Sequence, residues 1–435
     1  MLALGVVLFF LLLMVSIALH ELGHLILAKR FGVRCPQYMV GFGPTLKSWR
    51  RGETEYGFKW IPFGGYVRMI GMLPPRTGDP EGGPRRSSGR PSERGRFTQL
   101  VDSARKEALE EVGPGDEHRV FYGKKWWQKA LISFAGPLMN FLLALVLLGT
   151  ALMGFGIKEP TMTVGTVAAC VVPAAQPVRE CRAGDPPTPA ARAGLRPGDR
   201  IVSFDGAPVS SYEGFQRLVR DSAGRQVRLG VRRDGRDLVL TPTLIATRLP
   251  SLNGGGSPAV TAGFLGITPV REYVRQSPLA VLSLMGEMTT RTLAAFATLP
   301  GKMAGVWDAS FNGAKRASDS PVGVVGASRI GGEVLAAHAA AVDKLVLFLL
   351  VLGSLNFGLA AFNLIPLLPL DGGNIAGALW EGVKRAFARL AGRPAPGPVD
   401  VAKALPFTYV VGALLLAMGL LIAYADLVNP IRLSG

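Results

Sequence analysis

Four long apolar stretches limit what this 435-residue chain can fold into, because a globular protein could not expose them to water. The first begins at Leu2 and carries no charge before His20. The other three cover residues 130–155, 345–370 and 405–428. Each can cross the ~30 Å hydrocarbon core of a bilayer once tilt is allowed. The sequence therefore predicts a polytopic α-helical membrane protein with four transmembrane helices, the first within residues 1–27.

A cleaved signal peptide is the alternative interpretation of the first stretch. The stretch lacks a basic segment before it and a small-residue cleavage site after it. It also continues directly into HELGH at residues 20–24. We therefore expect it to remain in the protein as a transmembrane helix.

The formal net charge of +17 raises the question of a polyanionic partner. No basic helix with interleaved aromatic residues and no nucleic-acid motif is present, so we expect anionic lipid headgroups rather than nucleic acid. The short loop at 371–404 is rich in Lys and Arg, which places it in the cytoplasm by the positive-inside rule. Residues 28–129 are then also cytoplasmic, whereas 156–344 and both termini are extracytoplasmic.

The segments between the predicted spans differ in character. In the cytoplasmic loop, Tyr56–Met72 predicts a small β-hairpin broken at Gly64 and Gly65, and Pro74–Arg96 predicts a disordered insert. Outside, residues 156–250 predict an inserted β-rich domain, and 251–344 a linker or helical region whose role is open. The fold class is thus a four-helix membrane protein with an extracytoplasmic β-rich domain.

The HELGH motif is the strongest chemical signal. On a helix, His20 and His24 lie on one face and can hold one Zn²⁺, while Glu21 lies beside them as the general base for a water molecule. A chance HExxH is the alternative. Only four histidines occur in the chain, and placing ionisable residues in an apolar helix is costly without a function, so the metal site is favoured.

A catalytic zinc needs a third protein ligand. His118 lies in a polar loop and His338 on the predicted outer side, so neither reaches HELGH easily. Asp371 ends the third predicted span on the same side as HELGH and is the better candidate. By its local sequence alone, Asp-Gly-Gly favours a turn at a helix end over a metal ligand.

Two further features have structural alternatives. Asn140 is an amide inside an apolar helix, which requires a partner and could simply bond to a neighbouring helix. Cys170 and Cys181 both lie in the outer segment, where the compartment is oxidising, and we expect a disulfide between them. Cys35 lies on the other side of the membrane in this topology.

These residues together resemble the site-2 protease family of intramembrane zinc metalloproteases. The resemblance covers most of the chain outside the Pro74–Arg96 insert and is closest to the bacterial branch with a single PDZ domain. The motifs occur in the family's order: HELGH, GFGP at Gly41–Pro44, AGPLMNF at Ala135–Phe141, the PDZ-like GLRPGDRIVSFDGAPV, and NLIPLLPLDGG at Asn363–Gly373. Asn374 follows LDGG where that branch often has a histidine.

The resemblance implies specific roles. His20, His24 and Asp371 bind one Zn²⁺, and Glu21 activates water. Asn140 lies near the cleft and helps to hold substrate or the oxyanion, and Asn363 and Pro366 shape the substrate path. The implied substrate is a single-pass membrane protein, an anti-sigma factor already cut by another protease. The implied location is the bacterial inner membrane, with the active site facing the cytoplasm.

Two other functions remain open from the sequence. A catalytically dead scaffold would not need an intact HELGH and Asp371. A zinc or ion transporter would not need Glu21 between the ligands, and the paired repeats typical of transporters are absent from the sequence.

Overall fold

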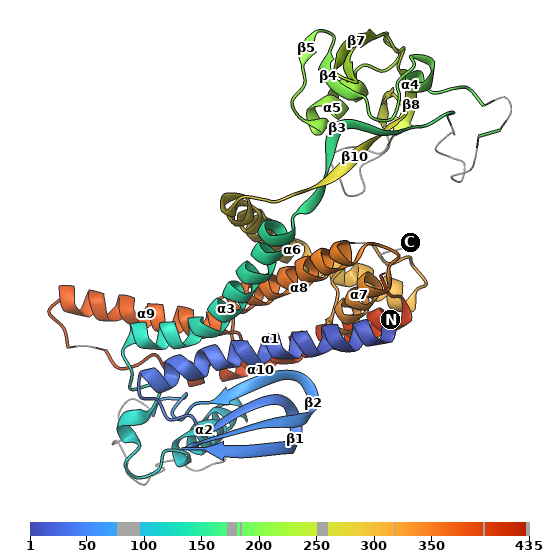
Figure 1. Ribbon diagram of the computed structural model, residues 1–435. Coiled ribbons are helices and arrows are strands. Elements are labelled where there is room, and N and C mark those ends of the chain that lie inside the picture. The colour runs from blue at the N-terminus through green and yellow to red at the C-terminus, as the bar shows by residue number, and fades with distance from the viewer. Residues whose placement is uncertain are drawn as a thin grey trace. The chain divides into compact units, whose positions relative to one another are not determined.

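The computed structural model describes residues 1–75, 96–171, 181–182, 185–249, 260–317, 319–394 and 396–431 (Figure 1). The predicted disordered insert Pro74–Arg96 lies almost entirely outside these residues. The chain divides into two compact units. One unit joins Met1–Phe155 with Ser277–Gly435, and the other is Gly156–Gln276.

The first unit is mainly helical, and four of its helices are long and apolar enough to cross a membrane. These four candidate spans are α1 (Leu2–Arg30), α3 with its π-helical extension η3 (Trp126–Gly149 and Thr150–Phe155), α8 (Ala341–Asn363) and η4 with α10 (Val401–Ala404 and Leu405–Val428). The remaining helices of the unit are α2 (Arg96–Glu110), η2 (Glu117–Arg119), α6 (Pro278–Phe311), α7 (Val324–Ala336) and α9 (Asp371–Leu390). The four predicted spans therefore all have a helical counterpart.

Small residues bring the helices of this unit close together. A Cβ atom on Gly23 of α1 would overlap the Ala135 carbonyl of α3, and one on Gly332 of α7 would lie 2.9 Å from the Leu2 carbonyl oxygen of α1. Such close backbone contacts are typical of helix pairs in membranes, where lipid offers no hydrophobic advantage to looser packing. Helix α1 is thereby held between α3 and α7.

The third predicted span, 345–370, is wrong at its C-terminal end. Helix α8 already ends at Asn363, residues 364–370 are irregular, and Asp371 is the first residue of α9 instead of the last residue of the span. Pro366 and Pro369 lie in this interval, and proline donates no backbone hydrogen bond and disfavours a helical conformation at the preceding residue. The predicted loop 371–404 consequently contains a helix of 20 residues.

The predicted hairpin is also wrong in its turn. The strands are β1 (Gln37–Arg51) and β2 (Thr54–Arg68), and the chain reverses at Gly52, which has a φ of 63°. Both strands bend, so that residues 37–40 of β1 pair with residues 55–58 and also with 65–68 of β2. Gly64 and Gly65 therefore lie inside β2. Two hydrogen bonds connect the hairpin to α1, from the Tyr38 hydroxyl to the Ala18 carbonyl and from Lys29 Nζ to the Tyr56 hydroxyl.

The second unit is β-rich, as the sequence predicts, but longer. Its main sheet has the order β10-β3-β4-β6-β7, with β5 paired to β4, and β8 pairs with β9. The elements are β3 (Ile157–Val167), α4 (Pro189–Arg192), β4 (Arg200–Phe204), β5 (Ala207–Pro208), α5 (Tyr212–Asp221), β6 (Leu229–Arg233), β7 (Arg236–Leu240), β8 (Ile245–Leu249), β9 (Val260–Phe264) and β10 (Ile267–Val274).

The predicted boundary at residue 250 is too early because β10 pairs antiparallel with β3 and closes the sheet. This partner lies about a hundred residues away in sequence, at Ile157–Val167, so no local signal indicates the pairing. The predicted linker 251–344 is thus shared between the units: β9 and β10 belong to the second, and α6 and α7 to the first.

The GLRPGD segment of the second unit is held by one buried carboxylate. Asp199 is 1% exposed, and its oxygens accept hydrogen bonds of 2.7 and 2.8 Å from the Arg233 guanidinium. The backbone N–H of Arg196 donates a third. The bonds from Arg233 lower the pKa of Asp199, so the carboxylate stays ionised and fixes the turn against β6.

Cys170 and Cys181 form a disulfide, with their Cα atoms 5.9 Å apart. Cys35 is a buried free thiol, and burial raises its pKa to about 12. We therefore expect the native, non-reduced protein to react slowly with thiol reagents and the denatured, non-reduced protein to show one thiol per chain. Thiol titration with and without denaturant checks this, and three titratable thiols in the non-reduced chain would contradict the disulfide.

Candidate metal centre

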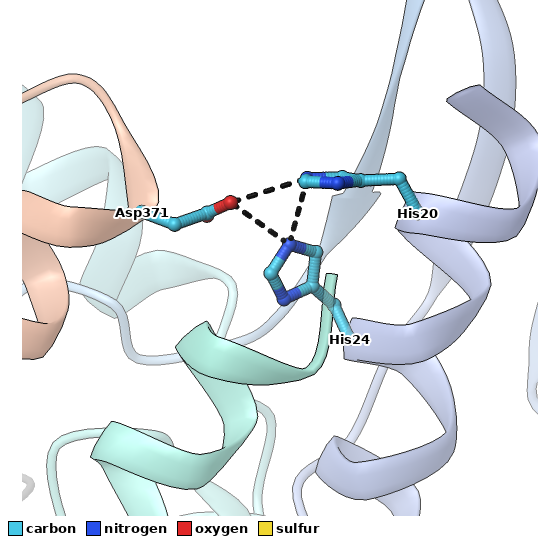
Figure 2. A group of neighbouring side chains, drawn as sticks. All are labelled: His20, His24 and Asp371. Carbon is cyan, nitrogen blue, oxygen red and sulfur yellow. Dashed lines mark hydrogen bonds and ion pairs between the residues drawn. The ribbon is translucent and has the colours of Figure 1, made fainter. Parts of the chain in front are cut away.

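HELGH lies in the second half of α1, and both of its imidazoles turn toward Asp371 (Figure 2). The Nε2 atoms of His20 and His24 are 3.3 Å apart. Asp371 Oδ2 lies 3.1 Å from the first and 3.3 Å from the second. The histidines are 7% and 6% exposed. Within the part of the chain that the structure describes, this is the one group of at least three His, Cys, Asp or Glu side chains that is close enough to hold a metal ion.

Asp371 reaches the histidines because α9 begins immediately at the end of the irregular segment. Gly372 and Gly373 lie so close to this segment that a Cβ atom on either would overlap the backbone of residues 364–368. Their role is therefore close approach and not a left-handed turn.

The donor set fits a zinc ion. The ring nitrogen Nδ1 of His24 is 2.8 Å from the Ile132 carbonyl oxygen, and since a carbonyl only accepts, Nδ1 carries the proton. Neutral His24 then turns an unprotonated Nε2 toward the Asp371 carboxylate, and two acceptors 3.3 Å apart repel unless a cation or a second proton lies between them. Zinc bonds of ~2.0–2.1 Å in a tetrahedral arrangement separate the ligand atoms by ~3.3 Å, which the three observed distances match.

Asn140 holds the other histidine. It is fully buried, and its Nδ2 atom lies 3.3 Å from His20 Nδ1. Its Oδ1 has no hydrogen-bond partner among the described residues. Turning the amide by 180° places Oδ1 opposite Nδ1–H and satisfies both groups, and it leaves His20 Nε2 unprotonated for a metal. This geometry is that of a positioning residue for His20, whereas the family resemblance implies that Asn140 helps to hold substrate or the oxyanion.

The side chain of Glu21, on α1, lies against the hairpin. A Cβ atom on Gly65 of β2 would be 3.1 Å from Glu21 Cγ, so the absence of a side chain there gives the carboxylate its space. Glu21 interacts electrostatically with both histidines and with Asp371. The residue expected to act as general base therefore borders the metal centre.

The other sequence-predicted residues lie elsewhere. The Asn363 side chain donates to the Leu359 carbonyl of its own helix, and Pro366 is exposed in the segment before Asp371. His118 and His338 are not part of the metal group. Two other carboxylates, Glu53 and Asp426, also lie outside the metal group. Glu53 accepts hydrogen bonds from Arg119, and Asp426 from the backbone at the start of α7.

Sequence reasoning missed two contributors. The Ile132 carbonyl orients His24, and a backbone carbonyl leaves no signal in a sequence. Gly136 of α3 faces the histidines so closely that a Cβ atom on it would lie 2.7 Å from His20 Nε2. Gly136 belongs to the AGPLMNF motif, but that motif does not indicate that α3 packs directly against the two histidines.

Comparison with known proteins identifies the family. The model of peptidase family M50 matches residues 8–395. The chain belongs to peptidase family M50. The M50 peptidase is 37% identical over 443 residues to the zinc metalloprotease Rip1 of Mycobacterium tuberculosis, covering 99% of this chain and 98% of that relative. It is 34% identical over 448 residues to Rip1 of Mycolicibacterium smegmatis, with coverage of 100% and 99%.

A more distant relative is also a metalloprotease. The metalloprotease MmpA of Caulobacter vibrioides is 28% identical over 394 residues, which is 85% of each chain. These matches confirm the family that the motifs resemble and establish a zinc-dependent metallopeptidase of the membrane. The roles of individual residues in the M50 peptidase rest on the geometry above.

Removing the carboxylate tests the third ligand. Asp371→Ala should lower zinc affinity more than ~100-fold, beyond the usual effect of losing an outer partner, because two histidines leave zinc under-coordinated. Equilibrium dialysis with zinc analysis of the full chain in detergent measures this. Glu53→Ala is the matched control and should keep full affinity. Full zinc loading of Asp371→Ala would exclude Asp371 as a ligand.

Removing the amide tests the positioning of His20. Asn140→Ala should weaken zinc binding ~10- to 100-fold while the protein remains folded, because the imidazole loses the group that fixes its orientation. Asn356→Ala is the control, since Asn356 is equally buried but donates to the Leu352 carbonyl of its own helix. Equal zinc affinities in the two variants would show that Asn140 serves only packing.

Proposed function

We propose that this metallopeptidase is an intramembrane endopeptidase that hydrolyses a peptide bond in or beside a transmembrane segment of another protein. The supporting observation is the position of the metal centre. Two of its residues belong to the first candidate span, and the third follows shortly after another. A site built from such helices meets substrate at or near membrane depth.

The chemistry then divides among a few residues. His20, His24 and Asp371 would hold one Zn²⁺, which when bound would act as a Lewis acid on the scissile carbonyl and lower the pKa of water toward ~7. Glu21 takes the proton from the attacking water and returns it to the leaving amine. Asn140 and the Ile132 carbonyl keep the two imidazoles in the required tautomer.

An apolar cavity of about 450 Å³ supports a substrate path next to Asp371. It is lined by side chains of α6, the end of α8, α10 and the segment before Asp371, including Phe296, Phe362, Leu370 and Leu414. We infer that Asn363 and Pro366 shape this substrate path indirectly. Asn363 is the last residue of α8, Pro366 lies in the irregular segment that follows, and other residues of that segment line the cavity. On the other side of the centre, a substrate backbone laid along β2 at Gly65 would reach Glu21.

The topology of the proposal follows the charge pattern. The active site faces the cytoplasm, and the β-rich unit, which we regard as PDZ-like, lies outside together with both termini. The membrane is the bacterial inner membrane. A PDZ-like unit would bind a peptide end as an added strand or exclude large substrates.

The substrate class is the most specific part of the proposal. We infer a single-pass membrane protein, an anti-sigma factor that another protease has first shortened, acting in a stress-signalling cascade. This rests on the resemblance to the bacterial site-2 proteases. A catalytically dead scaffold would not process any membrane protein, and a zinc transporter would move metal across vesicles without cleaving anything.

Substitution of the general base tests the proposal. Glu21→Gln should retain zinc and lose cleavage by a factor of ~10² or more, because the positioned proton acceptor is gone. Membrane fractions of cells producing the wild type or Glu21→Gln are compared by mass spectrometry of new chain ends. New ends within predicted transmembrane segments should appear with the wild type alone. Identical fragment patterns, or new ends confined to soluble segments, would contradict an intramembrane peptidase.

A further inference from the structure

Helix α9 exposes its large apolar side chains and buries a charged one, which is the reverse of an amphipathic helix in a water-soluble protein. Its outward side carries five large apolar side chains that are 42% to 86% exposed. They are Leu379, Trp380, Val383, Phe387 and Leu390. Spacings of three and four residues align them along one face of the helix. We refer to these five residues as the apolar stripe of α9.

The inward face of α9 carries a buried carboxylate beside the small residues Gly372 and Ala378. Glu381 is 1% exposed and pairs with Lys129 of α3, at 2.8 Å, and with Arg385, at 2.7 Å. In water a helix buries its apolar face and exposes its charges, because burial of apolar surface is favourable and burial of charge is costly. Since α9 does the opposite, its outward face is adapted to a medium other than water.

The connections of α9 keep it close to the bilayer. The candidate span α8 ends at Asn363, and residues 364–370 can extend over ~25 Å at most. The candidate span α10 begins at Leu405, shortly after α9 ends at Leu390. The medium available to the apolar stripe is therefore lipid.

Basic side chains border the stripe. Lys384 and Arg389 lie on its two sides, and Arg393 follows the helix end. Arg385 is engaged by Glu381. Basic flanks beside an apolar face with a tryptophan are the pattern of a helix at the membrane surface, where Lys and Arg reach the phosphate groups.

We propose that α9 forms a binding site for anionic phospholipid. The apolar stripe lies at the boundary between headgroups and acyl chains, and Lys384, Arg389 and Arg393 contact the phosphates. Because α9 begins at Asp371, the same lipid contact holds the carboxylate at the metal centre. The lipid site rests on the exposure and charge of α9 and does not depend on which substrate the peptidase cuts.

Spin labels on the full chain in nanodiscs test the lipid contact. In a Cys35→Ser background, single labels are introduced by Leu379→Cys, Val383→Cys and Phe387→Cys. Collision rates should be high with oxygen, which dissolves in lipid, and low with a water-soluble nickel complex. A label at Glu213→Cys, whose parent side chain is 82% exposed in the β-rich unit, should show the reverse.

Two outcomes would overturn the lipid contact. Strong collision with the nickel complex at the stripe would mean water, and weak collision with both reagents would mean a covering protein or a second copy of the chain. Apart from the Cys35→Ser change that all of them share, these variants change exposed side chains only, so the unlabelled Cys35→Ser chain is the reference for the fold.

Lipid composition tests the charge. In nanodiscs of phosphatidylcholine with phosphatidylglycerol, native mass spectrometry should show retained phosphatidylglycerol. Lys384→Gln, Arg389→Gln and Arg393→Gln should each lower this retention about fivefold, the effect of ~1 kcal/mol per basic residue near an anionic surface. Lys106→Gln, an exposed site on α2, is the control and should have no effect. Equal retention in all variants would overturn the headgroup contact.

Discussion

Three donor atoms from opposite ends of the chain meet within 3.3 Å in an apolar helical unit, and this arrangement is the constraint on which the rest depends. Carboxylate and imidazole groups are costly to place among apolar helices. A cation shared by the three groups would remove that cost and would link residues that are 351 positions apart in sequence. The proposed metal centre would therefore stabilise the contact between α1 and α9 as well as serve the chemistry.

The neighbouring contacts make the ligand positions reproducible. Gly23 and Gly136 let α1 and α3 approach closely, which places the Ile132 carbonyl at His24 and Asn140 at His20. The third residue of the group, Asp371, begins α9, and the buried Lys129–Glu381 pair fixes α9 against the same helix α3. Removing one partner of such a pair typically costs 3–5 kcal/mol, because the remaining charge stays buried. Helix α3 is thus the common support of all three ligands.

The sequence predicts the parts of this account that depend on local pattern. Apolar length gives the four spans, and the spacing of His20 and His24 gives the metal face of α1. Asp371 required the topology argument and the family resemblance, because Asp-Gly-Gly is locally indistinguishable from a turn. Pro366 and Pro369 indicate a break in the third span, but the apolar residues around them continue the hydropathy signal of a longer span. The closing strand β10, the bent hairpin and the role of Asn140 depend on partners far away in sequence and could not be derived from local pattern.

X-ray absorption spectroscopy at the zinc edge tests the central claim most directly. The purified full chain should contain one zinc with four light ligands at ~2.0–2.1 Å, and the outer-shell pattern of two imidazoles should be visible. No sulfur ligand is expected, because Cys35 is not part of the metal group and the other two cysteines form a disulfide. A sulfur shell at ~2.3 Å, or a spectrum without imidazole, would contradict a zinc site made of His20, His24 and Asp371.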